Sequence, residues 1–187
     1  SLYELKEGDV VSVDCGFYKD GYHGDHAYTF AVGEVPADVS KLMRVTKESL
    51  ALAIAAAKEN NRVGDISFAV ENHTNKINGY GVVRELVGHG VGKYLHEDPQ
   101  VPNYGRRGDG KRLKTGMVLA IEPMINLGTH RVNTMEDGWT IVTADGKVSV
   151  HYEHTTLVGV NSGEALSNFS PIEEAERANA ALSTAHL

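Results

Sequence analysis

The sequence has one cysteine, one tryptophan and five prolines among its 187 residues, and aromatic residues make up only 7%. The lone Cys15 excludes a disulfide within the chain and is typical of a reducing compartment. No apolar run reaches the length of a membrane span, so no transmembrane helix is expected. The N-terminus lacks a basic stretch followed by an apolar one, so no signal peptide is predicted and the expected location is cytoplasmic.

An excess of positive charge is also missing. The chain has 18 Lys+Arg against 25 Asp+Glu, for a net charge of −7. This acidic balance argues against a nucleic-acid-binding surface, and we interpret the basic cluster in residues 106–114 as a solvated loop. The hydrophobic share of 41% and the charged share of 23% are ordinary for one globular domain with a core.

The most distinctive segment is residues 86–104, which holds His89 and His96 with three glycines around the first histidine. It follows an apolar run, residues 80–87, that predicts a strand. Glycines let another backbone or a ligand approach closely, so we expect His89 to be an exposed ring at a strand end. Taken alone, the pattern fits equally well a buried histidine that is hydrogen-bonded in a tight turn.

Residues 10–17 and 22–32 read as two strands on either side of Asp20-Gly21, and an Asp-Gly pair is the strongest short hairpin signal. If these two residues form the centre of the turn, Asp14 faces Ala27 across the ladder. Asp25 then lies diagonally from Asp14 on the same face.

Two carboxylates placed together on a half-buried sheet would repel one another and lose hydration. A cation between Asp14 and Asp25 would remove both costs. The alternative is a pair of solvated loop aspartates.

Two helices are expected before the histidine segment, over residues 38–58 and residues 65–77, the second with Asp65 as its N-cap. Residues 97–115 are predicted to be a polar loop. Ser170 begins a capping-box pattern that predicts a short helix in the tail.

Residues 117–121 form a continuous apolar run that predicts a strand buried on both faces. Glu122 ends this strand, and a glutamate in such a place must be paired or bound to a metal. A second hairpin is predicted over residues 139–158 around Asp145-Gly146. In this register Glu153 lies opposite Gly138.

Five residues at or near the ends of predicted strands form a candidate metal-binding set: Asp14, Asp25, His89, Glu122 and Glu153. Four carboxylates and one imidazole suit Mn, Fe, Co or Zn better than a structural zinc site built from thiolates. In order and spacing, and in the histidine segment, the set resembles the five metal ligands of type I methionine aminopeptidases. The resemblance covers roughly residues 5–169.

The resemblance implies an α/β (α+β) fold of the pita-bread aminopeptidase/creatinase-like kind, a curved antiparallel sheet with flanking helices. It also implies a metallo-aminopeptidase catalytic domain over residues 1–169. Family members carry a further segment before this region, so the domain is expected to be N-terminally incomplete. Residues 170–187 are expected to be a short helical tail.

The implied activity is removal of the N-terminal methionine from nascent polypeptides. In the family, two divalent ions (Co, Mn, Fe or Zn) activate a water that attacks the first peptide bond. Asp14 would bind one ion, His89 and Glu122 the other, and Asp25 and Glu153 both.

The resemblance also assigns residues to the chemistry and to the substrate. Glu122 would pass a proton from the water to the leaving amine. His96 would hydrogen-bond the scissile amide or the developing oxyanion, although its ring could instead cap the turn at residues 97–99. Leu95, His96 and Trp139 would contact the substrate.

The expected partners are peptides with N-terminal methionine and nascent chains, with ribosome association left open. No direct recognition of nucleic acid, no membrane attachment and a monomer are expected. One alternative is a peptidase like prolidase or aminopeptidase P, which shares the ligands. Residues 93–99, which follow the first histidine, favour the methionine-specific branch. The other alternative is a non-catalytic binding protein of the same fold, against which the intact ligand set argues.

Overall fold

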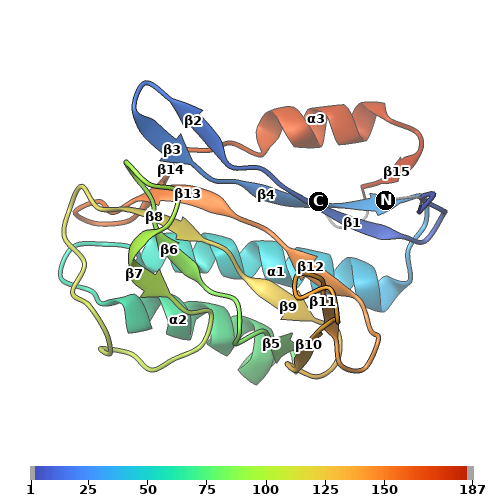
Figure 1. The fold of residues 1–187 in the computed structure, drawn as a ribbon, viewed down its shortest axis with the longest axis horizontal. Helices are drawn as coiled ribbons and strands as arrows, with labels where there is room; N and C mark the ends of the chain where they lie inside the picture. The colour runs from blue at the N-terminus through green and yellow to red at the C-terminus, as the bar shows by residue number, and fades with distance from the viewer. Residues whose placement is uncertain (1–2, 185–187) are drawn as a thin grey trace.

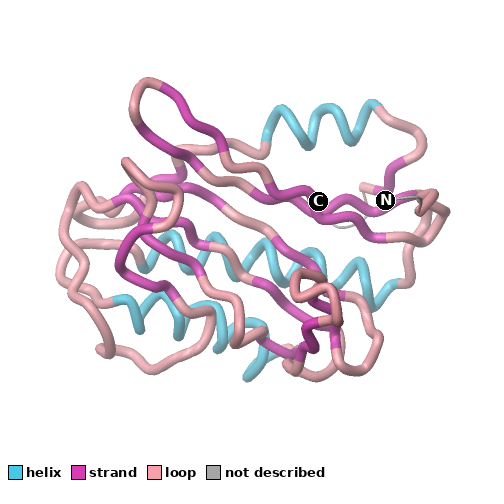
Figure 2. The backbone as a smooth tube through the Cα atoms, in the orientation of Figure 1, coloured by secondary structure: helices cyan, strands magenta, loops and turns pink. Residues whose placement is uncertain are grey.

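The structure, a computed structural model, describes residues 3–184. Two hairpins that are far apart in the sequence supply most of its strands, and all the pairings between named strands are antiparallel. The described helices are α1 (Ala37–Ala56), α2 (Val63–Glu71), its π-helical continuation η1 (Asn72–Ile77), and α3 (Ser170–Ala178). Helices α1 and α2 lie side by side, whereas α3 runs along the first hairpin (Figures 1 and 2).

The first hairpin has the predicted register. Its outer pair is β1 (Val10–Asp14) with β4 (Ala27–Val32), and its inner pair is β2 (Phe17–Lys19) with β3 (Tyr22–Gly24). Asp14 lies opposite Ala27, as expected. Asp20 and Gly21 both have positive φ, 53° and 90°, which is the backbone that a two-residue hairpin turn requires.

The second hairpin is longer than predicted and turns elsewhere. It pairs β8 (Val118–Ile121) with β13 (His154–Leu157), β9 (Met124–Asn126) with β12 (Ser149–His151), and β10 (Val132–Thr134) with β11 (Ile141–Thr143). The residue numbers of every pair add up to the same total, which centres the hairpin between Asp137 and Gly138. The predicted register around Asp145-Gly146 is therefore wrong.

Hydrogen bonds explain why the chain turns at Asp137. Its carboxylate accepts the backbone N–H groups of Trp139 and Thr140, at 2.9 and 2.8 Å, and Gly138 has a φ of 70°. Asp145 instead accepts the N–H of Thr129, which lies between β9 and β10. In the observed register Glu153 falls opposite Glu122, whereas the predicted register placed it opposite Gly138.

The segment around His89 also differs from the prediction. The expected strand over residues 80–87 is reduced to β5 (Gly81–Val82), and His89 lies in the middle of β6 (Gly88–Gly90). Residues expected to be loop form β7 (Glu97–Val101), which pairs with β6. The glycines permit this packing, because a Cβ at Gly88 would come within 2.3 Å of the Ala120 carbonyl oxygen.

Two helices begin differently from the prediction. Helix α2 begins two residues before Asp65, whose carboxylate accepts the N–H of Arg62 at 2.8 Å from inside the first turn. In α3, Ser170 is the first helical residue and makes no side-chain cap. The remaining short strands are β14 (Glu164–Ala165) and β15 (Leu182–Ser183), and β15 pairs with β4.

The main core lies between α1, α2 and the strands of the second hairpin. It includes fully buried side chains from each of these elements, such as Leu42 and Leu50 of α1, Ile66 of α2, and Leu119 and Ile121 of β8. These contacts support β8 from one side, directly before Glu122.

Within residues 3–184, no helix is both long and apolar enough to cross a bilayer.

Replacement of Leu119 by alanine should destabilise the protein by about 2–5 kcal/mol, because it leaves a cavity against a packed helical layer. The matched control is Leu52→Ala on α1, where the side chain is 46% exposed. That change should stay within about 0.5 kcal/mol. Urea unfolding in one buffer compares the two, and equal losses would contradict the position assigned to the core.

Candidate metal centre

The five predicted ligands come together from five places in the fold. Asp14 ends β1, Asp25 follows β3, His89 lies in β6, Glu122 follows β8, and Glu153 separates β12 from β13. Ligand atoms of Asp14, Asp25 and Glu153 lie within 4.8 Å of one another, and the same holds for His89, Glu122 and Glu153. Glu153 belongs to both groups and therefore lies between them.

Backbone contacts hold these side chains in place. The Thr155 hydroxyl accepts the N–H of Asp25 and donates to its carbonyl, both at 2.8 Å. The N–H of Glu153 donates to the Ala27 carbonyl at 2.9 Å, which joins the two hairpins at the site. The carboxylates thus project from a fixed backbone rather than from free loops.

His89 has the tautomer that a metal ligand needs. Its Nδ1 lies 2.9 Å from the carbonyl oxygen of Gly90, and a carbonyl only accepts, so Nδ1 carries the proton. The lone pair of Nε2 then points toward the carboxylates, 3.6 Å from Asp25 Oδ2 and 3.4 Å from Glu122 Oε1. Histidines that bind metals are usually oriented by such a bond from the other ring nitrogen.

Burial and, after it, the crowding of negative charge raise the pKa values of three carboxylates in the cluster. Burial, followed by the charges of Asp14 and Asp25, raises the pKa of Glu122 to about 8. Burial and the charges of Glu122, Asp25 and Asp14 raise the pKa of Glu153 to about 10. Burial likewise raises the pKa of Asp14.

The residues fit divalent cations. Glu153 Oε1 is buried, and within the described chain it has no hydrogen-bond partner. No lysine or arginine between residues 3 and 184 forms an ion pair with the five ligands. An oxygen-rich set with one imidazole and an uncompensated negative charge is suited to Mn, Fe, Co or Zn.

His96 and Leu95 border the cluster, whereas, in the part of the chain that the structure describes, no contact between Trp139 and the cluster is seen. The rings of His96 and His89 have centroids 4.3 Å apart, and His96 has a ring nitrogen within 4.8 Å of ligand atoms of Asp25 and His89. A Cβ added to Gly16 would lie 3.2 Å from Leu95 and 3.7 Å from Asp25, so Leu95 packs beside this ligand. Trp139 follows the turn of the second hairpin and is 88% exposed.

Three side chains near the site were not predicted. The Asn103 amide donates to the Glu122 carbonyl at 2.9 Å, Thr155 holds Asp25, and His151 lies beside Glu122 with Nε2 3.7 Å from Oε2. Each of these side chains contacts a residue that is far from it in the sequence. The equal spacing of four residues from Asp25 to Thr29 and from His151 to Thr155 is a signal in the sequence that could have pointed to His151 and Thr155, but not to Asn103.

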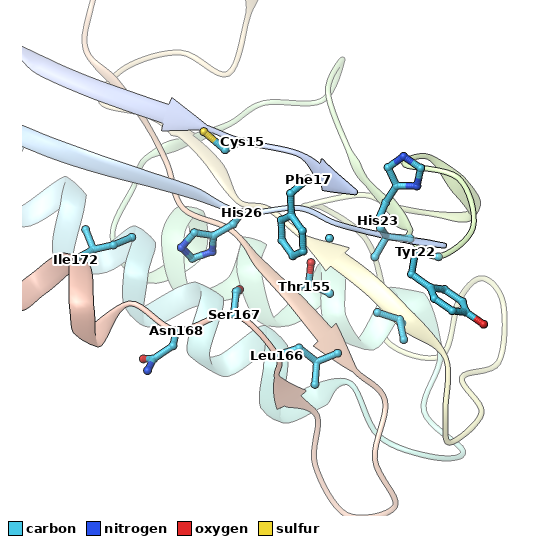
Figure 3. A pocket seen from close by; sticks show the side chains of 14 residues that line it. Cys15, Phe17, Tyr22, His23, His26, Thr155, Leu166, Ser167, Asn168 and Ile172 are labelled. Carbon is cyan, nitrogen blue, oxygen red and sulfur yellow. The ribbon is translucent and has the colours of Figure 1, made fainter. Parts of the chain in front are cut away.

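A cavity of about 590 Å³ lies behind the ligands, and none of the five ligands lines it. Its walls include the chain neighbours of the two aspartates, Cys15, Gly24 and His26. In Figure 3, Phe17 and His26 lie on one side of this space and Leu166 and Ser167 on the other. The ligands and their neighbours thus face opposite sides of the hairpin.

Comparison with known proteins agrees with this geometry. The model of metallopeptidase family M24 matches residues 1–159. The methionine aminopeptidase of Clostridium perfringens is 52% identical over 165 residues, which cover 88% of this chain and 66% of that protein. Methionine aminopeptidase 1 of Bacillus subtilis is 51% identical, with coverage of 82% and 62%. The chain thus spans somewhat less than two thirds of the length of these relatives.

Solved structures give the same result. The crystal structure of methionine aminopeptidase from Thermotoga maritima superposes with a TM-score of 0.84 at 49% identity, over 87% of this chain and 65% of that one. The prolidase from Pyrococcus furiosus gives a TM-score of 0.70 at 25% identity, over 90% and 44%. These are pita-bread peptidases, so the predicted fold class is confirmed.

The stability of the metal-free protein should fall as the pH rises from about 7 to about 9. The pKa values of Glu122 and Glu153 in the folded state, about 8 and about 10, exceed their ordinary value of 4.5. Their contribution to folding is therefore complete below about pH 4.5 and is lost as each is forced to ionise. Histidines whose pKa is lowered by burial, such as His26 and His154, are already neutral in this window.

Thermal unfolding in chelator measures this slope. The double variant Glu122→Gln, Glu153→Gln should flatten it, since neither amide titrates. Manganese should flatten it in the wild-type protein. An equal slope in the double variant would show that other groups are responsible.

Proposed function

Because the chain belongs to metallopeptidase family M24, we propose that it forms the catalytic part of an aminopeptidase that removes the N-terminal methionine from nascent polypeptides. The observation that carries this proposal is the convergence of Asp14, Asp25, His89, Glu122 and Glu153. Relatives at about half identity that are named methionine aminopeptidase support the substrate class. Nascent chains as substrates imply action in the cytoplasm.

We assign the site two divalent ions. The position of Glu153 in two ligand groups, and of Asp25 between Asp14 and His89, supports a bridging role for both residues. Asp14 would hold one of these ions, and His89 and Glu122 would hold the other. Bound ions of this kind lower the pKa of a coordinated water and so supply hydroxide at neutral pH.

The chain's own residues would then handle the proton and the substrate. Glu122 is the assigned proton acceptor, because its carboxylate lies in the ligand cluster, with Oε1 3.4 Å from His89 Nε2, where it could take a proton from the water and pass it to the leaving amine. His96 is exposed beside the ligands and is assigned to donate a hydrogen bond to the oxygen of the scissile bond. Its alternative role as a cap for a turn at residues 97–99 is disfavoured, because these residues belong to strand β7, which pairs with β6.

Selectivity for methionine is assigned to Leu95, which lies beside Asp25, together with His96 and Trp139. A proline-directed peptidase is the second candidate, because prolidases share the fold. The higher TM-score and identity to a methionine aminopeptidase favour the first candidate.

Calorimetric titration of the metal-free chain should approach about two equivalents of Mn²⁺ or Co²⁺, as in other two-metal peptidase sites. Asp25→Ala should weaken both binding steps, because Asp25 lies near both sets of ligands. Asp14→Ala should remove mainly one. Equal metal content in the wild type and Asp25→Ala would defeat the ligand assignment.

Hydrolysis of a Met-Ala-Ser peptide tests the catalytic roles. His96→Ala should lower kcat roughly 10²–10³-fold with little change in metal content, as loss of an oxyanion donor does. Glu122→Gln should abolish turnover. The control is His73→Ala, which removes a distant ring bonded to Glu48 at 2.8 Å and should leave kcat unchanged. Unchanged kcat in His96→Ala would rule out the donor role.

A further inference from the structure

Glu122 lies between two imidazoles, of which only one belongs to the predicted ligand set. His89 Nε2 is 3.4 Å from Glu122 Oε1, and His151 Nε2 is 3.7 Å from Glu122 Oε2. His151 belongs to none of the candidate ligand groups found among residues 3–184. It is therefore placed to act on Glu122 rather than on a metal ion.

The backbone of His151 is held firmly by the other hairpin. The buried Thr29 hydroxyl donates to the His151 carbonyl at 2.6 Å and accepts the His151 N–H at 3.0 Å. Because that hydroxyl has a single proton, the Ser12 hydroxyl 2.8 Å away must donate to it. A chain of hydrogen bonds from β1 and β4 thus holds the residue that faces Glu122.

The same arrangement holds Asp25. Thr155 bonds both the N–H and the carbonyl of Asp25, as Thr29 does for His151. Thr155 lies four residues after His151, the residue that Thr29 holds. In the same way, Thr29 lies four residues after Asp25, the residue that Thr155 holds. Asp25 and His151 thus occupy equivalent positions in the two hairpins, and the position in the first hairpin belongs to the ligand set.

The Nε2 atom of the His151 ring is buried, and within the described part of the chain it has no hydrogen-bond partner. A buried polar atom without a partner costs stability, and Glu122 Oε2 is the acceptor that lies beside it. A small rotation of either side chain would bring the two atoms into bonding range.

We propose that His151 is a positioning residue whose Nε2–H donates to Glu122 Oε2 and so keeps Oε1 directed at His89 and the ligand cluster. The proposal rests on the proposed metallopeptidase function. A fixed carboxylate orientation serves metal binding and proton acceptance alike, and outer partners of this kind commonly change metal affinity or activity about 10–100-fold.

The test compares His151→Leu, which has no donor, with His151→Gln, whose amide can donate to the same oxygen. We expect His151→Leu to lose about 10–100-fold in Mn²⁺ affinity at one of the two sites and a similar factor in kcat, with KM little changed. His151→Gln should recover most of both. The control is His73→Leu, whose ring contacts Glu48 away from the cluster.

Calorimetry on metal-free protein supplies a readout that does not depend on turnover. Equal Mn²⁺ affinity in the wild type and His151→Leu would overturn the inference, and so would equal losses in the Leu and Gln variants. Loss of a whole equivalent of metal in His151→Gln would make His151 a ligand instead. If His151→Leu does not fold, His151→Met serves as the variant without a donor. Failure of the wild type to bind metal would instead refute the proposed function.

Discussion

Asp14, Asp25, Glu122 and Glu153 bring four negative charges together where two of these side chains are buried, and their repulsion opposes the folded state unless protons or cations offset it. The four carboxylates stay close together in spite of this repulsion, because each is attached to the backbone at the end of a strand or directly beside one. Burial, followed by this repulsion, raises the pKa values of Glu122 and Glu153. Core packing under β8 and the bonds between the hairpins are what resist the repulsion.

Two hairpins with the same turn chemistry create the site between them. Each is centred on an Asp-Gly pair, Asp20-Gly21 in one and Asp137-Gly138 in the other. At matching places the first hairpin offers Asp14 and Asp25, and the second offers Glu122 and His151. The site therefore has an approximate symmetry that is broken where an imidazole replaces a carboxylate, which lowers the negative charge around Glu122.

The sequence predicted the turn and the register of the first hairpin, because Asp20-Gly21 has no competing Asp-Gly pair nearby, although each predicted strand is interrupted in the structure. It failed on the second because residues 137–146 contain two Asp-Gly pairs, and only the side-chain bonds of Asp137 decide between them. Strand β6 was missed because glycines have low strand propensity, although close approach to Ala120 requires them there. The five ligands could be named from their order and spacing, whereas His151 could not, since its role depends on pairing across β9 and β12 and on Thr29.

The reciprocal threonine bonds make the two halves of the molecule dependent on one another. Thr29 in the first half fixes His151 in the second, and Thr155 in the second fixes Asp25 in the first. Asp25 is synthesised well before Thr155, so the early half of the chain cannot hold this carboxylate in its final geometry alone. The metal-binding geometry is thus complete only when the second hairpin has been made and has paired with the first.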